Sequence, residues 1–259
     1  MPQTTENYRE NSRGLLAILK GESGEGKSVA ALSFPNSYTF DFDRKMPAIG
    51  MKHYPGKTLE WDTFEDIFEI QQKVSDFMIT CPYETLVVDS ITGLVNIVMD
   101  SVGFVKKEAV PDILKRVTPK SNTIEMMGID YYSAEDRFCT WFVDQLKVLW
   151  ARSGNPKHVI FIAHVVQVDS APDLKTKVVT RTRSIVAKGK KFPAWLPTGF
   201  DNVYLVAREL PDLGDIDQSQ KRVVLTEAFG EDSAKCSYAL PWKIDISKGN
   251  FYDQIKGAL

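Results

Sequence analysis

Short apolar runs recur along the chain, and each has the length of a buried strand rather than of a helix. Most are almost continuously apolar instead of alternating, which is typical of strands covered on both faces. Polar or charged residues follow nearly every run. The runs lie at residues 15–19, 38–42, 58–61, 85–88, 158–163 and 202–206.

Two longer segments, residues 63–77 and 134–151, have the apolar spacing of amphipathic helices. Their apolar positions are Phe64, Ile67, Phe68 and Ile70 in the first segment, and Phe138, Trp141, Phe142, Leu146 and Leu149 in the second. A further helix is expected to begin at residues 29–32, after a glycine-rich loop. Helices therefore alternate with strands.

This alternation predicts an α/β fold with a mostly parallel central sheet flanked by helices on both faces. Right-handed crossovers bring the carboxyl ends of parallel strands to one edge of the sheet, where ligands bind. Two later runs, residues 222–227 and 237–246, predict a C-terminal antiparallel extension. We expect a flexible N-terminal arm at residues 1–13 and one domain over residues 14–259.

Composition narrows the class of protein. Hydrophobic residues make up 43% of the chain and charged residues 25%, which suits a globular core. The formal net charge of −2 restricts any nucleic-acid contact to a local basic patch. No apolar run approaches the roughly 18 residues of a membrane span. The cysteines are Cys81, Cys139 and Cys236, whose wide spacing favours reduced thiols in a cytoplasmic protein.

The glycine-rich loop fits the pattern G-x-x-x-x-G-K-[ST], with a predicted strand before it and a predicted helix after it. Such a loop cradles phosphates with backbone N–H groups at a helix N-terminus. We expect it to bind ATP, with Lys27 on the β- and γ-phosphates and the Ser28 hydroxyl on Mg²⁺. The residues expected around the nucleotide are Gly21, Glu22, Ser23, Gly24, Glu25, Gly26, Lys27, Ser28 and Val29.

A Mg²⁺ site beside phosphates also needs a carboxylate at the end of a buried strand. Asp89 follows the run at residues 85–88 and is the predicted partner of Ser28. Two apolar runs separate the P-loop from Asp89, so we expect their two strands not to be adjacent in the sheet. A small-molecule kinase would instead pair these two strands directly.

The order of these elements resembles the RecA core. In that core, a strand with acidic residues at its end follows the phosphate loop, and a later strand runs into an Asp-Thr-x-Glu sequence. More closely, the chain is similar to the small RecA-core proteins of bacteriophages, which act in single-stranded DNA annealing and recombination. The matching residues are Asp62, Thr63, Phe64 and Glu65, with Leu240, Pro241 and Trp242 near the end.

The resemblance implies roles for individual residues. Glu65 matches the position of the carboxylate that orients the attacking water, and Asp43 is the rival for that role. His164 takes the place of a glutamine sensor for the γ-phosphate. Lys188 and Lys190 lie where the family has a lysine that can reach a neighbouring subunit's γ-phosphate. A homo-oligomer, either ring or filament, is therefore expected.

Residues 174–191 are dense in positive charge and contain no acidic residue. Neutralising DNA phosphates requires such density, and alternating arginines share one face of a hairpin. A solvated hairpin without a ligand is the alternative. The basic residues expected to contact DNA are Lys175, Lys177, Arg181, Arg183 and Lys191.

Three functions remain open from the sequence. The first is a single-stranded-DNA-dependent ATPase, with a single-strand-binding protein as a further candidate partner. The second is a regulatory ATP-binding module that assembles on a protein. The third is a small-molecule kinase. The sequence does not separate DNA from RNA.

Overall fold

The structure is a computed structural model of the chain. It describes residues 14–104, 129–152, 156–169, 181–209, 221–228, 234–247 and 249–259. The predicted arm at residues 1–13 lies outside the described residues. Among the described helices, none is both long and apolar enough to cross a membrane.

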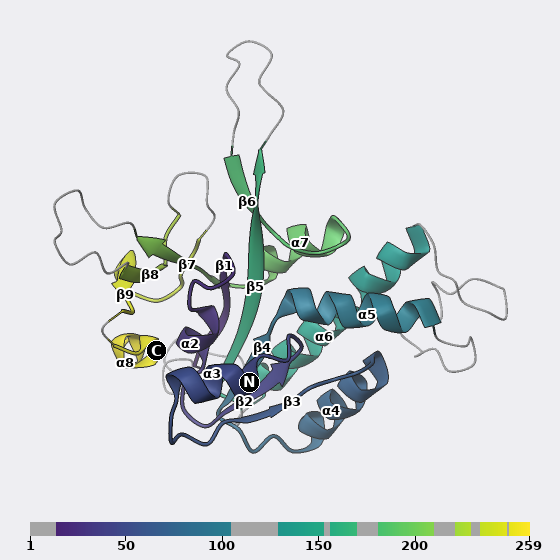
Figure 1. Cartoon of the computed structure of the whole chain (residues 1–259), viewed down its shortest axis with the longest axis horizontal. Helices are drawn as coiled ribbons and strands as arrows, with labels where there is room; N and C mark the ends of the chain where they lie inside the picture. The colour runs from purple at the N-terminus through teal and green to yellow at the C-terminus, as the bar shows by residue number, and fades with distance from the viewer. Residues whose placement is uncertain are drawn as a thin grey trace, which may run out of the picture.

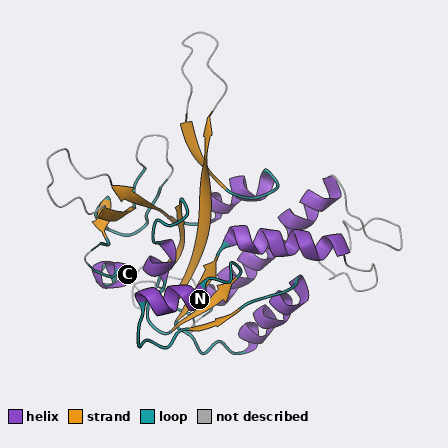
Figure 2. Cartoon of the chain, in the orientation of Figure 1, coloured by secondary structure: helices purple, strands orange, loops and turns teal. Residues whose placement is uncertain are grey.

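Strands and helices alternate along most of the chain (Figure 2). The strands are β1 (Leu16–Gly21), β2 (Ser37–Asp41), β3 (Glu60–Asp62), β4 (Thr85–Asp89), β5 (His158–Asp169), β6 (Arg181–Ile185), β7 (Asn202–Glu209), β8 (Lys221–Leu225) and β9 (Lys243–Asp245). The helices are α2 (Lys27–Ala31), α3 (Met46–His53), α4 (Ile67–Ile79), α5 (Ile91–Phe104), α6 (Ile129–Ala151), α7 (Lys191–Trp195), the 3₁₀ helix η3 (Leu196–Gly199) and α8 (Phe251–Ile255).

The strands form a sheet in the order β3-β2-β4-β5-β1-β7-β8-β9. All pairs from β3 to β7 are parallel, which confirms the predicted sheet. β1 and β4 are not adjacent, also as predicted. The strand between them is β5, which follows β4 in the chain, whereas β2 and β3 lie beyond β4. This order disfavours the kinase interpretation.

Alternate residues of the central strands point to opposite faces of the sheet, and each face is covered by helices. Ile18 and its neighbours on one face join the cluster that includes buried residues of α4, α5 and α6. Leu19 and its neighbours on the other face pack with Phe34 after α2 and with Phe251 of α8. These three layers account for the continuously apolar strands.

Two antiparallel additions complete the sheet. β8 pairs with β7 and β9 pairs with β8, which confirms the predicted C-terminal extension. β5 extends past the sheet and pairs with β6, so the two strands form a hairpin that projects from the body of the molecule (Figure 1). The basic segment was expected to form a hairpin. Its described part includes β6, which is the second strand of the β5–β6 hairpin.

Some helices differ from the sequence prediction. α4 begins at Ile67 rather than at residue 63, because the Asp66 carboxylate accepts hydrogen bonds from the N–H groups of Phe68 and Glu69 and caps the helix. α3, α5, α7 and α8 were not predicted. α5 continues to Phe104, and a polar and basic stretch of sequence follows it.

Candidate functional site

The P-loop connects the end of β1 to the start of α2. Gly24 and Gly26 have φ angles of 84° and 97°, a backbone region that residues with a Cβ atom rarely adopt. The loop therefore requires glycine at both positions. The Lys27 ammonium folds back along the loop and donates hydrogen bonds to the carbonyl oxygens of Gly21 at 2.9 Å and Glu22 at 2.6 Å.

Lys27 is the buried cation of this loop. Burial lowers the pKa of its ammonium group to about 8, while the negative charges of Asp89 and Glu25 act in the opposite direction. A buried cation is costly unless it meets negative charge. An anion held by the loop would supply that charge.

Asp89 ends β4 and is buried. Its carboxylate accepts a hydrogen bond from the hydroxyl of Ser28, and its Oδ2 atom is buried without a hydrogen-bond partner. Burial raises the pKa of Asp89 to about 6, and the Ser28 hydrogen bond opposes that shift. The structure thus brings together the two residues that were predicted as a metal pair.

This pair fits a Mg²⁺ ion. Ser28 offers a hydroxyl and Asp89 offers an unsatisfied carboxylate oxygen. Among the described residues there is no cluster of three or more His, Cys, Asp or Glu side chains that would hold a metal alone. A sparse set of protein ligands is usual for Mg²⁺, which takes its other ligands from phosphate and water.

Asp43 lies beside this pair, two residues beyond β2. Its Oδ2 atom lies 3.2 Å from His164 Nε2 and accepts hydrogen bonds from the Ser90 hydroxyl at 3.1 Å and the Lys45 ammonium at 3.0 Å. Burial alone would raise the pKa of Asp43, but the hydrogen bonds from His164 and Lys45 lower it to about 2. Asp43 is therefore a fixed negative charge at neutral pH.

The neighbouring acid, Asp41, has a structural role. Its carboxylate accepts hydrogen bonds from the backbone N–H groups of Lys45 at 3.0 Å and Met46 at 2.9 Å, and so holds the start of α3. Of these two acids, only Asp43 makes side-chain contacts with His164 and Ser90.

Glu65 occupies a different place. It follows β3, the edge strand, which β2, β4 and β5 separate from β1. Its side chain is 72% exposed and forms an ion pair with Arg44 at 2.8 Å. The structure thus gathers Asp43, not Glu65, with Asp89 and His164.

His164 lies directly opposite Gly21 in the register between β5 and β1. This register places the imidazole at the sheet edge beside the P-loop, where a γ-phosphate sensor was expected. Its Nε2 atom contacts Asp43, while its Nδ1 atom is buried without a hydrogen-bond partner. The ring therefore has one unused polar atom.

The predicted DNA-contacting residues are only partly described. Lys175 and Lys177 lie outside the described residues, as does the side chain of Arg181. Arg183 is on β6, and its Nε atom lies 3.7 Å from the carboxylate of Glu22. The hairpin is thus tied to the P-loop by an ion pair.

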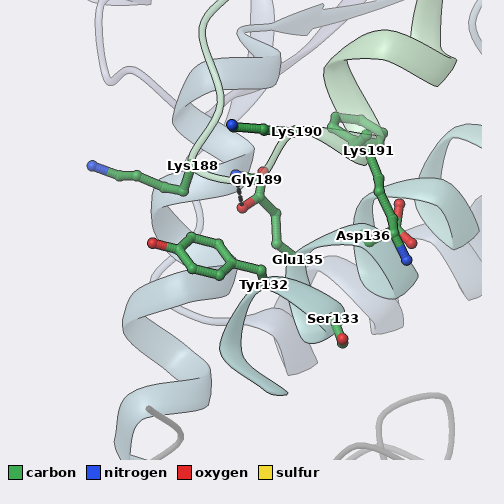
Figure 3. A pocket seen from close by; sticks show the side chains of 9 residues that line it. Tyr132, Ser133, Glu135, Asp136, Lys188, Gly189, Lys190 and Lys191 are labelled. Atoms are coloured by element: carbon green, nitrogen blue, oxygen red, sulfur yellow. Dashed lines mark hydrogen bonds between the residues drawn. The ribbon is translucent and has the colours of Figure 1, made fainter. Parts of the chain in front are cut away.

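Lys188, Lys190 and Lys191 form part of a separate cavity. Its volume is about 390 Å³, and it lies between the start of α6 and the loop before α7. The buried Glu135 carboxylate accepts a hydrogen bond from the Gly189 N–H at 2.8 Å and anchors that loop (Figure 3). In the same view the ammonium group of Lys188 points away from Glu135.

Two arginines beside the P-loop were missed. Arg208 of β7 donates a hydrogen bond to the Gly24 carbonyl at 2.8 Å. Arg222 of β8 lies against Gly26, since a Cβ atom built on that glycine would be 3.2 Å from Arg222 Cδ. An isolated arginine in a strand gives no sequence signal that it lies beside a P-loop. Their position depends on how β7 aligns with β1.

A family model described as an AAA domain matches residues 13–235, which is most of the chain. No curated protein matches the chain in sequence.

Proposed function

Because the chain belongs to the AAA domain family of nucleotide-binding P-loop proteins, we propose that it binds ATP with Mg²⁺ and hydrolyses it, with Asp43 orienting the attacking water. The observation that carries this proposal is the convergence of Asp43, Asp89 and His164 beside the P-loop. Asp43 and Asp89 lie close enough for the charge of Asp43 to raise the pKa of Asp89, in addition to the larger effect of burial.

Hydrolysis joins the oxygen of a water molecule to the γ-phosphorus and breaks the bond from that phosphorus to the β,γ-bridging oxygen. ADP leaves with the bonding electrons, and the water proton passes to phosphate or solvent. Little covalent help is needed, so positioning and charge dominate the rate. Lys27 and the P-loop N–H groups hold the phosphates. Bound Mg²⁺, held by Ser28 and Asp89, would neutralise charge on the phosphates.

Asp43 suits an orienting role better than a proton-accepting one. A carboxylate with a pKa of about 2 is a weak base, but it remains charged and is fixed by its contacts with Ser90, Lys45 and His164. It can therefore accept a hydrogen bond from water in a defined direction. His164, with its unused Nδ1 atom, is our candidate for sensing the γ-phosphate.

We further propose that single-stranded DNA binds the β5–β6 hairpin and stimulates turnover. Three observations support this. Basic residues are dense in the sequence of β6 and of the segment before it, the β5–β6 hairpin projects from the body (Figure 1), and Arg183 pairs with Glu22 of the P-loop. DNA phosphates that compete for Arg183 would release Glu22, and this links the two sites.

The remaining expectations on assembly stay proposals. A homo-oligomer would allow Lys188 or Lys190 to reach the γ-phosphate of a neighbouring subunit, and a single-strand-binding protein is a candidate partner on DNA. Within one chain these lysines line their own cavity with Glu135 and Gly189.

ATP turnover measured with and without single-stranded DNA tests the proposal. We expect basal turnover that rises with DNA, and Lys27→Ala should abolish ATP binding or turnover. Turnover that DNA does not change would remove the DNA-dependent part alone. Binding without any turnover would favour the regulatory ATP-binding module. Unchanged hydrolysis in Lys27→Ala would remove the P-loop assignment.

A further inference from the structure

β7 and β8 place two arginines, Arg208 and Arg222, beside the P-loop. β7 runs parallel to β1 and continues past its end, since a Cβ atom on Gly21 would meet the Val206 carbonyl oxygen at 2.3 Å. Arg208, two residues farther along β7, is therefore level with the loop. Besides its bond to the Gly24 carbonyl, its Nε atom lies 3.6 Å from the Glu25 carboxylate.

Arg222 faces Arg208 directly across the antiparallel β7–β8 pair. The backbone of Arg222 is fixed by the C-terminal segment, because its N–H donates to the Ser247 hydroxyl at 2.6 Å and its carbonyl accepts from the Ile246 N–H at 2.8 Å. Its guanidinium makes no hydrogen bond or ion pair with the residues that the structure describes.

The charge of Arg222 also reaches the end of α3. Burial lowers the pKa of His53, at the end of α3, and the positive charges of Lys52 and Arg222 lower it further. Like charges directly opposite each other on paired strands also destabilise a sheet. Glu25 offsets the charge of Arg208, but no described carboxylate pairs with Arg222. This arrangement suits an anion beside Gly26.

The strand order indicates which part of a nucleotide reaches these arginines. The residues assigned to the γ-phosphate, to Mg²⁺ and to water come from β5, from β4 and from the segment after β2, all on one side of β1. β7 and β8 lie on its other side. A phosphate chain held along the loop has its γ end toward His164. Its nucleoside end consequently lies toward Arg222.

On the basis of the ATP binding proposed above, we propose that Arg222 binds the α- and β-phosphates of the nucleotide, and that Arg208 is a positioning residue that holds the loop through Gly24 and Glu25. Arg222 then contributes equally to ATP and ADP binding, because both nucleotides carry these phosphates. The ligand class is a nucleoside di- or triphosphate.

The test is the affinity of purified full-length variants for ATP and for ADP, each measured by calorimetry with Mg²⁺. Arg222→Ala should weaken both about tenfold, which corresponds to about 1.4 kcal/mol. Arg222→Lys should recover part of the loss because it keeps a positive charge. Lys221→Ala is the matched control, since it removes one positive charge from the adjacent exposed position of β8 and should leave both affinities unchanged.

Thermal unfolding without nucleotide separates binding from folding. Removing Arg222 relieves the repulsion with Arg208, so the variant should be at least as stable as the parent without nucleotide. Added ADP should stabilise it less than the parent. Affinities that equal those of the parent would overturn the proposal, as would a loss confined to ATP. A parent that binds neither nucleotide would instead refute the proposed function itself.

Discussion

The carboxylate of Asp43 lies 3.2 Å from Nε2 of His164, although β4 separates their strands in the sheet. Both side chains reach over the end of β4, where Ser90 donates a second hydrogen bond to the same Asp43 oxygen. Asp43 beyond β2, His164 of β5 and Ser90 after β4 therefore form one hydrogen-bonded unit.

Asp43→Asn should keep ATP binding and lower turnover by about 100-fold or more, which is the size of effect expected when a positioned catalytic group is removed. The amide has nearly the same shape, but it lacks the charge that holds a water molecule beside the phosphate. Single-turnover hydrolysis and nucleotide binding, measured in parallel, separate the two effects.

Glu65→Gln is the matched control for that variant. It makes the same chemical change at an exposed carboxylate that pairs with Arg44, so turnover should stay close to that of the parent. If Glu65→Gln lost turnover and Asp43→Asn retained it, Glu65 would be the water-orienting residue, as the resemblance to RecA first implied.

Asp89→Asn should remove the tightening of ATP binding by Mg²⁺. Affinities measured with Mg²⁺ and with a chelator should therefore converge in this variant and differ in the parent. Without nucleotide, the variant should be at least as stable as the parent, because burial disfavours the Asp89 charge. A Mg²⁺ effect of parental size in Asp89→Asn would contradict the metal assignment.

Replacing Arg181 and Arg183 with alanine should weaken single-stranded DNA binding for all sequences alike. The slope of log DNA affinity against log salt concentration should become shallower by about 0.7 for each DNA phosphate that the variant no longer neutralises. ATP binding should survive, since the change lies on the hairpin. Fluorescence anisotropy over a series of salt concentrations measures both quantities.

Two controls sharpen the hairpin experiment. Lys52→Ala combined with Lys256→Ala removes the same amount of charge elsewhere and should leave the salt slope unchanged. Glu22→Gln removes the ion pair between Glu22 and Arg183 together with one negative charge, and should raise DNA affinity rather than lower it. An unaltered DNA affinity in the double arginine variant would refute the hairpin as the DNA site.

His158 should make the fold sensitive to mild acid. Its buried Nδ1 atom accepts a hydrogen bond from the Leu15 N–H at 3.0 Å, and burial lowers its pKa from 6.5 to about 4. The unfolded chain therefore binds a proton on His158 more readily than the folded protein does. Stability present above pH 6.5 is lost as the pH falls toward 4, by about 3 kcal/mol at most.

Asp89 acts in the opposite direction over a similar pH range, because its folded pKa is raised to about 6. The measurement is therefore the difference between the parent and His158→Asn in free energy of unfolding at several pH values. An asparagine amide oxygen can still accept the Leu15 hydrogen bond, but it does not titrate. The difference between the two proteins should shrink from pH 7 to pH 4.5, and a constant difference would exclude His158 as the cause.

The parts of this protein that local patterns specify were predictable. The P-loop residues and Asp89 occur in a motif with defined neighbours, and continuous apolar runs mark the central strands. α5 was overlooked even though Ile91, Leu94, Val95 and Val98 have helical spacing and are all buried. That signal was present in the sequence.

Local sequence patterns could not decide whether Asp43 or Glu65 lies beside the P-loop. Both are acids that follow a strand, and only the lateral order of β2 and β3 in the sheet decides which one reaches the P-loop. That order depends on pairing between distant segments, which the spacing of residues does not encode. Arg208 and Arg222 were out of reach for the same reason.

The placement of β1 between β5 and β7 also governs how the chain is assembled during synthesis. Leu16 pairs with Val159 and Ala17 pairs with Asn202, so both neighbours of β1 in the sheet come much later in the chain than β1 does. Closing such long loops is slow, and domains emerge from the ribosome N-terminus first. The P-loop is therefore translated well before β5 and β7, and nucleotide can stabilise the nascent protein only after both of these strands have been made.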